Sequence, residues 1–153
     1  MDDLKSILLA EDNPNDVELT LAALAEHHLT NDVVVVGDGA EALDYLRRQG
    51  RFAMRAGGNP AVVLLDIKMP KMDGFEVLRE IRADAALKEI PVVLLTSSRE
   101  ESDLAAGYRL GVNAYVVKPV DFKEFVAAVS QVGVFWALMN EPPPGSVRPG
   151  GRG

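Results

Sequence analysis

Five short apolar runs stand out along the chain because polar residues do not alternate with the apolar ones inside them. They are rich in Val, Ile and Leu and occupy residues 7–10, 33–36, 61–65, 91–95 and 114–117. Short continuous apolar runs are typical of strands that are buried on both faces, as in parallel sheets. The pattern therefore predicts five strands of one parallel sheet.

Stretches with helical spacing separate these runs. The first begins with Asn13 as the expected N-cap and Pro14 at the first helical position, and its apolar residues share one face. The later helices are expected after residues 37–39, after residues 73–74, from a capping-box pattern at 98–101 to Gly111, and from about residue 121 to about residue 139. Strand and helix thus alternate five times. The expected fold is α/β, a doubly wound five-stranded parallel sheet with helices on both faces and right-handed crossovers.

Two segments fall outside this alternation. Residues 49–60 contain two Arg and three Gly and are expected to form an exposed loop. Residues 141–153 are rich in Pro and Gly and have almost nothing to bury, so a flexible tail is expected there. The predicted organisation is one domain over residues 1–140 followed by that tail.

Composition narrows the class of protein. The chain has 153 residues, 48% of them apolar, which suffices for one domain with a full core. A formal charge of −7 argues against nucleic-acid binding, and the absence of cysteine excludes disulfides and thiol chemistry. No apolar stretch is long enough to suggest a membrane span, and the first residues lack the basic start of a secretion signal. A cytoplasmic protein without membrane contact is the expectation.

Polar side chains follow the predicted strands where each strand ends. Glu11 and Asp12 follow the first run, Asp66 the third, Thr96 the fourth and Lys118 the fifth. The carboxyl ends of parallel strands form one edge, where ligands bind in open α/β sheets. Three clustered carboxylates repel one another unless a cation joins them, so a divalent metal ion is expected.

The chemistry of this set suits phosphoryl transfer. A carboxylate such as Asp66 can act as a nucleophile toward phosphorus and form an aspartyl phosphate. Such a transfer mainly requires alignment and charge neutralisation, which Mg²⁺ held by Glu11 and Asp12 can help to supply. The Lys118 ammonium and the Thr96 hydroxyl are suited to bind phosphoryl oxygens.

The chain resembles the response-regulator receiver domains of two-component signalling, which have a flavodoxin-like fold. The resemblance covers roughly residues 5–135 and rests on motifs whose order and spacing match. These motifs lie at residues 8–13, at 64–70 with 72–74, at 94–97, and at Lys118-Pro119. Each is weak alone, and together they are highly specific.

The resemblance implies a role for each matching position. Asp66 would accept a phosphoryl group from the histidine of a sensor kinase. Mg²⁺ would be held by Asp12, Asp66 and the main-chain carbonyl of Lys68, with Glu11 binding directly or through water. Thr96 and Lys118 would bind the phosphoryl group. The family often has two aspartates in the acidic pair, whereas this chain has Glu11 first, whose longer side chain would still reach the metal.

Two further implications concern the fifth strand. The Lys118-Pro119 peptide bond would be cis, a state that proline permits. Tyr115 matches the aromatic residue that reorients in this family when the threonine hydroxyl moves toward the phosphate. Strand propensity alone would instead make Tyr115 a half-covered strand aromatic.

Several features resemble the small regulators paired with bacterial phytochromes and similar sensor kinases. They are the segment 13–16, the segment 45–48 before a lengthened loop, and the segments 134–136 and 140–142. The receiver would use almost all of the chain, so the expected output is protein contact or onward transfer to a histidine phosphotransfer protein.

Other interpretations fit the residues less well. The alternative for the five-residue site is that these residues are ordinary surface carboxylates and a solvated lysine with no shared function. A phosphatase with an aspartyl intermediate needs a second carboxylate two positions after the nucleophile, where this chain has Lys68. A dinucleotide-binding module would need a Gly-rich loop after the first strand. Ser97 and Ser98 are expected to be helix caps, and His27 and His28 to be solvated.

The last predicted helix carries more apolar residues than one core-facing stripe can absorb. Phe135 and Trp136 are adjacent and must point in different directions. We expect them to anchor a two-fold dimer, and the alternative is a local cap on the core.

Overall fold

The computed structural model describes residues 6–25, 33–97 and 114–131. Within these ranges five parallel strands form one sheet in the order β2-β1-β3-β4-β5. The strands are β1 (Ile7–Ala10), β2 (Val33–Val36), β3 (Val62–Asp66), β4 (Val92–Thr96) and β5 (Ala114–Val117). The helices are α1 (Pro14–Ala25), α2 (Gly39–Arg47), α3 (Gly74–Ala83) and α5 (Phe122–Gln131), with a 3-10 turn η1 (Gly50–Phe52). The predicted α/β fold is confirmed.

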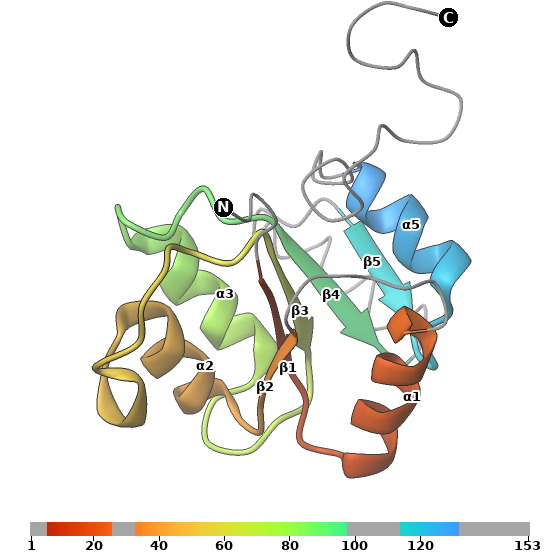
Figure 1. Cartoon of the computed structure of the whole chain (residues 1–153), viewed down its shortest axis with the longest axis horizontal. Coiled ribbons are helices and arrows are strands. Elements are labelled where there is room, and N and C mark those ends of the chain that lie inside the picture. Colours follow the sequence, from red (N-terminus) through yellow and green to blue (C-terminus); the bar gives the residue numbers. More distant parts are fainter. Residues whose placement is uncertain (1–5, 26–32, 98–113, 132–153) are drawn as a thin grey trace, which may run out of the picture.

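Helices cover both faces of the sheet (Figure 1). Alternate strand residues point to opposite faces, so Leu8 and Val63 face α2 and α3, whereas Ile7 and Val62 face α1 and α5. Both sets are fully buried, which explains why the strands read as continuous apolar runs rather than alternating ones.

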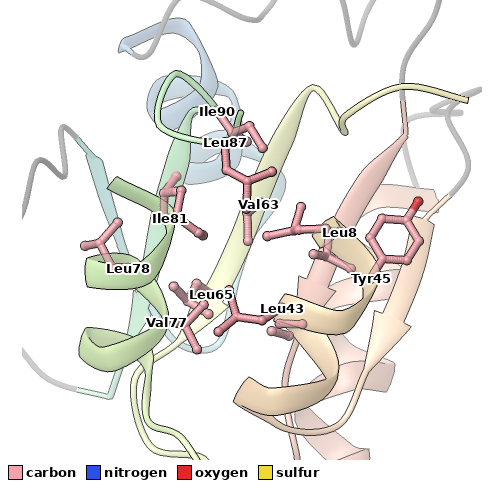
Figure 2. Packing of buried hydrophobic residues seen from close by; sticks show 14 of the residues in the cluster. Leu8, Leu43, Tyr45, Val63, Leu65, Val77, Leu78, Ile81, Leu87 and Ile90 are labelled. Carbon is pink, nitrogen blue, oxygen red and sulfur yellow. The ribbon is translucent and has the colours of Figure 1, made fainter. Parts of the chain in front are cut away.

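The core beneath α2 and α3 shows how the two helices are fixed on the sheet (Figure 2). Side chains from both helices converge on Leu8, Val63 and Leu65 of the strands. The contributing residues are Leu43 and Tyr45 of α2, Val77, Leu78 and Ile81 of α3, and Leu87 and Ile90 between α3 and β4. Full burial of each such aliphatic side chain stabilises the fold by roughly 1.5–3 kcal/mol.

All four described α-helices begin with side-chain caps close to the carboxyl ends of the strands, that of α5 being Asp121, whose Oδ1 accepts from the Glu124 N–H at 2.9 Å. Asn13 Oδ1 accepts hydrogen bonds from the backbone N–H groups of Asn15 (2.9 Å) and Asp16 (3.1 Å), so Asn13 is the predicted N-cap of α1. Asp38 caps α2, and Asp73 forms a capping box at the start of α3. These caps fix the turns in which the candidate site lies.

The strand predictions need small corrections at two places. The first, second and fifth strands have the predicted bounds, whereas β3 and β4 each begin and end one residue later than the predicted runs. Asp66 and Thr96 are therefore the last residues of their strands. The helix expected at 98–111, the part of the last helix beyond residue 131, Ser98, the two histidines, Phe135, Trp136 and the 141–153 tail lie outside the described residues.

The loop at 49–60 is exposed at most of its positions, as predicted, and it is anchored to α2. It contains η1, and the Phe52 ring packs edge-on against the Tyr45 ring with centroids 5.1 Å apart. Arg55 Nε donates a hydrogen bond to the Tyr45 carbonyl (2.7 Å), and its guanidinium lies 4.2 Å from the centre of the Tyr45 ring. Aromatic and cation–π contacts thus anchor the loop to α2. None of the helices in the described ranges is long and apolar enough to cross a membrane.

Candidate functional site

Strand register brings the predicted site residues to one edge of the sheet. Ala10 of β1 lies beside Leu65 of β3, so the next residues, Glu11 and Asp66, are neighbours. Asp66 is in turn paired with Leu95, and Thr96 with Val117. The edge at β1 and β3 is the switch point of this strand order, because the chain winds outward from it in both directions.

Three carboxylates meet at this point. One oxygen from each of Glu11, Asp12 and Asp66 lies within 4.8 Å of the others. Glu11 and Asp66 are buried, with 2% and 4% of their surfaces exposed, whereas Asp12 faces solvent. Two buried acids with a third at the entrance form an oxygen donor set of the kind that Mg²⁺ prefers. The residues present therefore fit the expected metal.

The Lys118 ammonium brings a positive charge to the carboxylate cluster. Its Nζ lies 3.1 Å from Glu11 Oε1, 3.0 Å from Asp66 Oδ1 and 3.0 Å from Asp16 Oδ2. The first two contacts join residues that the sequence had already grouped. Asp16 was not predicted as a site residue. The sequence feature that could have pointed to Asp16 is its position in the first turn of a helix that is capped by Asn13 and follows the acidic pair directly.

Burial controls the charge of the two inner acids. Desolvation, followed by repulsion from Asp66, raises the pKa of Glu11 from 4.5 to about 7, against the lowering effect of the Asn13 N–H and Lys118. Desolvation also raises the pKa of Asp66, although Lys118 opposes it. Burial would lower the pKa of Lys118, but its bonds to Asp16, Asp66 and Glu11 outweigh that effect and raise it. The lysine therefore remains charged. Its single positive charge does not fully compensate the burial of the Glu11 and Asp66 carboxylates, so the pKa values of both stay raised.

The turn after Asp66 lies tightly against the end of β3. The backbone N–H of Gly74 donates to the carbonyl of Ile67 at 2.7 Å. A Cβ at Gly74 would lie 2.5 Å from the Asp66 carbonyl oxygen, so only glycine fits. This contact fixes the turn that carries Lys68, which is exposed and whose main-chain carbonyl is the predicted metal ligand.

The other predicted residues lie on β4 and β5. Thr96 is fully buried, and its carbonyl accepts a hydrogen bond from the Lys118 N–H at 2.7 Å. The Lys118-Pro119 bond is cis, as predicted. Tyr115 is partly buried against the α2 and α3 side of the core, and burial raises its pKa. Its switching role remains a prediction.

Comparison with known proteins decides between the functions that such an edge can serve. The family model of the response regulator receiver domain matches residues 7–130. The chain belongs to this family. The match contains every strand and helix described above except the last residue of α5, and it agrees with the resemblance found in the sequence motifs.

Similar proteins include small regulators of the same length class. The response regulator Rcp1 of Synechocystis sp. is 38% identical over 132 residues, which cover 86% of this chain and 88% of Rcp1. The solved bacteriophytochrome response regulator RtBRR is 62% identical with a TM-score of 0.84, covering 94% of this chain and 86% of that one. The phosphorylated cyanobacterial phytochrome response regulator RcpA is 39% identical with a TM-score of 0.71, covering 95% and 99%. Rcp1 has also been solved in an Mn²⁺-bound form, with 35% identity, a TM-score of 0.69 and coverage of 95% and 99%.

Proposed function

We propose that this protein is a single-domain response regulator that accepts a phosphoryl group from a sensor histidine kinase onto Asp66. The observation that carries the proposal is the environment of that carboxylate. Asp66 is buried at the switch point, an ammonium lies 3.0 Å from it, and two further carboxylates lie within 4.8 Å. Membership of the receiver family and the phosphorylated relative RcpA support the same assignment.

The transfer step needs little from the protein beyond placement. An oxygen of the Asp66 carboxylate forms a bond to phosphorus while the P–N bond of the phosphohistidine breaks, and the imidazole nitrogen keeps the bonding electron pair. Lys118 and Thr96 would then bind phosphoryl oxygens. Lys118 already lies within ion-pair distance of the nucleophile, so its approach to the new group requires only a short movement.

Glu11, Asp12, Asp66 and the main-chain carbonyl of Lys68 would hold Mg²⁺. The bound ion would neutralise charge on the phosphoryl oxygens during transfer. The three converging carboxylates support this set, and so does the Mn²⁺-bound structure of the relative Rcp1. Glu11 is near enough to bind directly, so its extra methylene is compatible with the site.

The proposed protein stores a phosphoryl group and does not turn over external substrates. A hydrolase working through an aspartyl phosphate needs a general acid two positions after the nucleophile. That position is Lys68, whose side chain is exposed and basic. The reactions expected of the protein are self-catalysed phosphotransfer and autodephosphorylation.

The names of similar proteins point to a class of kinase. RtBRR and RcpA are response regulators of a bacteriophytochrome and of a cyanobacterial phytochrome. We propose a bacteriophytochrome-like sensor kinase as the partner, in the cytoplasm, with the receiver over residues 1–140 and a flexible tail over 141–153. Output would occur by protein contact or by transfer to a histidine phosphotransfer protein.

Dimerisation through Phe135 and Trp136 belongs to this proposal as well. The chain bears the two aromatic residues next to further apolar positions late in the sequence. Replacing both with Ala should lower the mass measured by light scattering from that of a dimer to that of a monomer. A mass equal to that of the wild type would refute the interface.

The phosphoacceptor assignment is tested with acetyl phosphate as donor in the presence of Mg²⁺. The wild type should gain one acid-stable, base-labile phosphoryl group, and Asp66→Asn should gain none. Glu18→Gln is the matched control because Glu18 is an exposed carboxylate on α1, and it should be labelled like the wild type. Labelling of Asp66→Asn at another residue, or of the wild type without Mg²⁺, would overturn the proposal. A phosphotransfer assay against candidate kinases would identify the partner.

A further inference from the structure

Asp16 contacts the site without being part of its acidic cluster. The three carboxylates that converge for a metal are Glu11, Asp12 and Asp66, and Asp16 is not among them. Asp16 nevertheless lies 3.0 Å from Lys118 Nζ through its Oδ2 atom. It lies in the first turn of α1, where the Asn13 cap fixes its backbone N–H. The contact therefore connects a surface helix to the lysine that would bind the phosphoryl group.

The donors of Lys118 are fully used in this structure. A lysine ammonium has three N–H donors. Its three carboxylate partners, Glu11, Asp16 and Asp66, lie at 3.0–3.1 Å. A phosphoryl group on Asp66 would bring new charged oxygen acceptors to the same place. Lys118 can bind one of them only if it weakens an existing contact.

Exposure decides which contact is weakened most easily. The Glu11 and Asp66 side chains are 0% and 6% exposed, whereas that of Asp16 is 30% exposed. A buried carboxylate that loses its cation cannot recover the loss from water, but a partly exposed one can. The Asp16 contact is therefore the one that is released at the lowest cost.

We infer that Asp16 is a positioning residue that competes with the phosphoryl group for Lys118. This inference rests on the proposed phosphoacceptor function of Asp66. In the unphosphorylated protein Asp16 holds the ammonium toward α1. On phosphorylation Lys118 exchanges Asp16 for a phosphoryl oxygen, and Asp16 becomes solvated. Asp16 thereby sets how strongly the site favours its phosphorylated form.

The substitution Asp16→Asn tests this competition because it keeps the size of the side chain and removes its charge. The ligands measured are Mg²⁺ alone, by calorimetry, and beryllofluoride at saturating Mg²⁺ as the noncovalent phosphoryl mimic. Beryllofluoride should bind about two- to fivefold more tightly to the variant, the range expected when a partly exposed ion-pair partner stops competing. Mg²⁺ should bind equally or more weakly, because a negative charge is lost and Lys118 turns more fully to Glu11 and Asp66. Damage to the pocket would weaken both ligands.

Glu18→Gln serves as the control, since it removes one exposed carboxylate from the same helix and should leave both affinities unchanged. Tighter beryllofluoride binding by Asp16→Asn alone, with Mg²⁺ binding equal or weaker, supports the inference. An unchanged or weaker beryllofluoride affinity, a parallel gain in Mg²⁺ affinity, or the same shift in Glu18→Gln would overturn it. Wild-type labelling on Asp66 is measured in parallel. If that labelling fails, the proposed function falls, whereas if it succeeds and Asp16→Asn matches the wild type, only the competition falls.

Discussion

The stability of the metal-free protein should fall as the pH rises from about 5 to about 8. The cause is Glu11, whose side chain has no exposed surface and lies beside Asp66. Ionising Glu11 places a second negative charge in a buried site where Lys118 is the neutralising cation. Most single domains lose stability on acidification because paired carboxylates become protonated. This site should produce the opposite slope.

The size of the effect follows from the pKa of Glu11. Its folded-state pKa is about 7, whereas the ordinary value is 4.5. Between these two values the folded protein binds more protons than the unfolded chain, so the free energy of unfolding decreases as the pH rises through that window. At about 1.4 kcal/mol per pKa unit, the loss attributable to Glu11 is about 3 kcal/mol and is complete by about pH 8. Asp66, whose pKa is also raised, adds to the slope in the same direction.

Urea unfolding in the presence of a chelator, repeated across this pH range, measures the slope. Glu11→Gln is the matched variant because it keeps the size of the side chain and removes its titration, at the cost of one of the two hydrogen bonds that Glu11 accepts from Lys118 and from the Asn13 N–H. The variant should show a much smaller slope and should exceed the wild type in stability at about pH 8. Saturating Mg²⁺ should restore the wild type at high pH, because ligand binding to the folded state stabilises it. A metal-free wild type whose stability is flat or increases with pH, or a variant with the same slope, would refute the reasoning.

Three further expectations concern the metal, the turn after β3 and the helix pair. Mg²⁺ affinity, measured by calorimetry, should decrease as the pH falls below about 7, because protons compete for the buried carboxylates; a constant affinity would contradict this. Gly74→Ala should lose about 1–3 kcal/mol in urea unfolding because its Cβ meets backbone at 2.5 Å, whereas Gly37→Ala, with nothing within 4 Å, should be nearly neutral. Equal effects of the two glycine variants would show that the turn is not tight. Arg47→Ala removes ion pairs to Glu80 (3.0 Å) and Asp84 (3.3 Å) that join α2 to α3. The three side chains are 27–49% exposed, so the loss should be at most about 1 kcal/mol and smaller in high salt; a larger or salt-independent loss would argue against a surface ion pair.

The fold and most of the site could be predicted because Glu11, Asp12, Asp66, Thr96 and Lys118 each lie at the end of a strand or within two residues after it. Non-alternating apolar runs predict strands of a sheet that is buried on both faces, and both faces of this sheet are buried. Parallel strands place their carboxyl ends at one edge, so Glu11, Asp66 and Lys118 had to converge without any knowledge of side-chain contacts. The one-residue shift of β3 and β4 does not change this conclusion, because Asp66 and Thr96 stay at the same edge.

Contacts made between elements were harder to foresee. Asp16 and Lys118 are separated by 102 positions, and their meeting depends on how α1 packs on the face of the sheet that it shares with α5. A carboxylate in the first turn of a helix is ordinarily explained by the helix dipole, so its position near the acidic pair was a weak signal that did not distinguish a site residue from a helix-stabilising one. The Gly and Arg content of the loop at 49–60 likewise gives no indication that the loop is anchored to α2. Its order comes from contacts with Tyr45 on α2, a residue that composition does not connect to it.

The same burial that destabilises the metal-free pocket suits it to its proposed task. A fully solvated pair of acids would bind Mg²⁺ weakly, because water would already satisfy both charges. Glu11 instead has one oxygen on Lys118 and the other on the Asn13 N–H at 3.2 Å, so it is held in place before a metal arrives. Asp12, the exposed member, remains at the entrance. A cation entering past Asp12 would therefore meet two acids that are fixed in position and short of positive charge, and much of the binding free energy would come from relieving that shortage. On this view the instability at high pH and the affinity for Mg²⁺ have one cause, and Glu11→Gln should reduce both together.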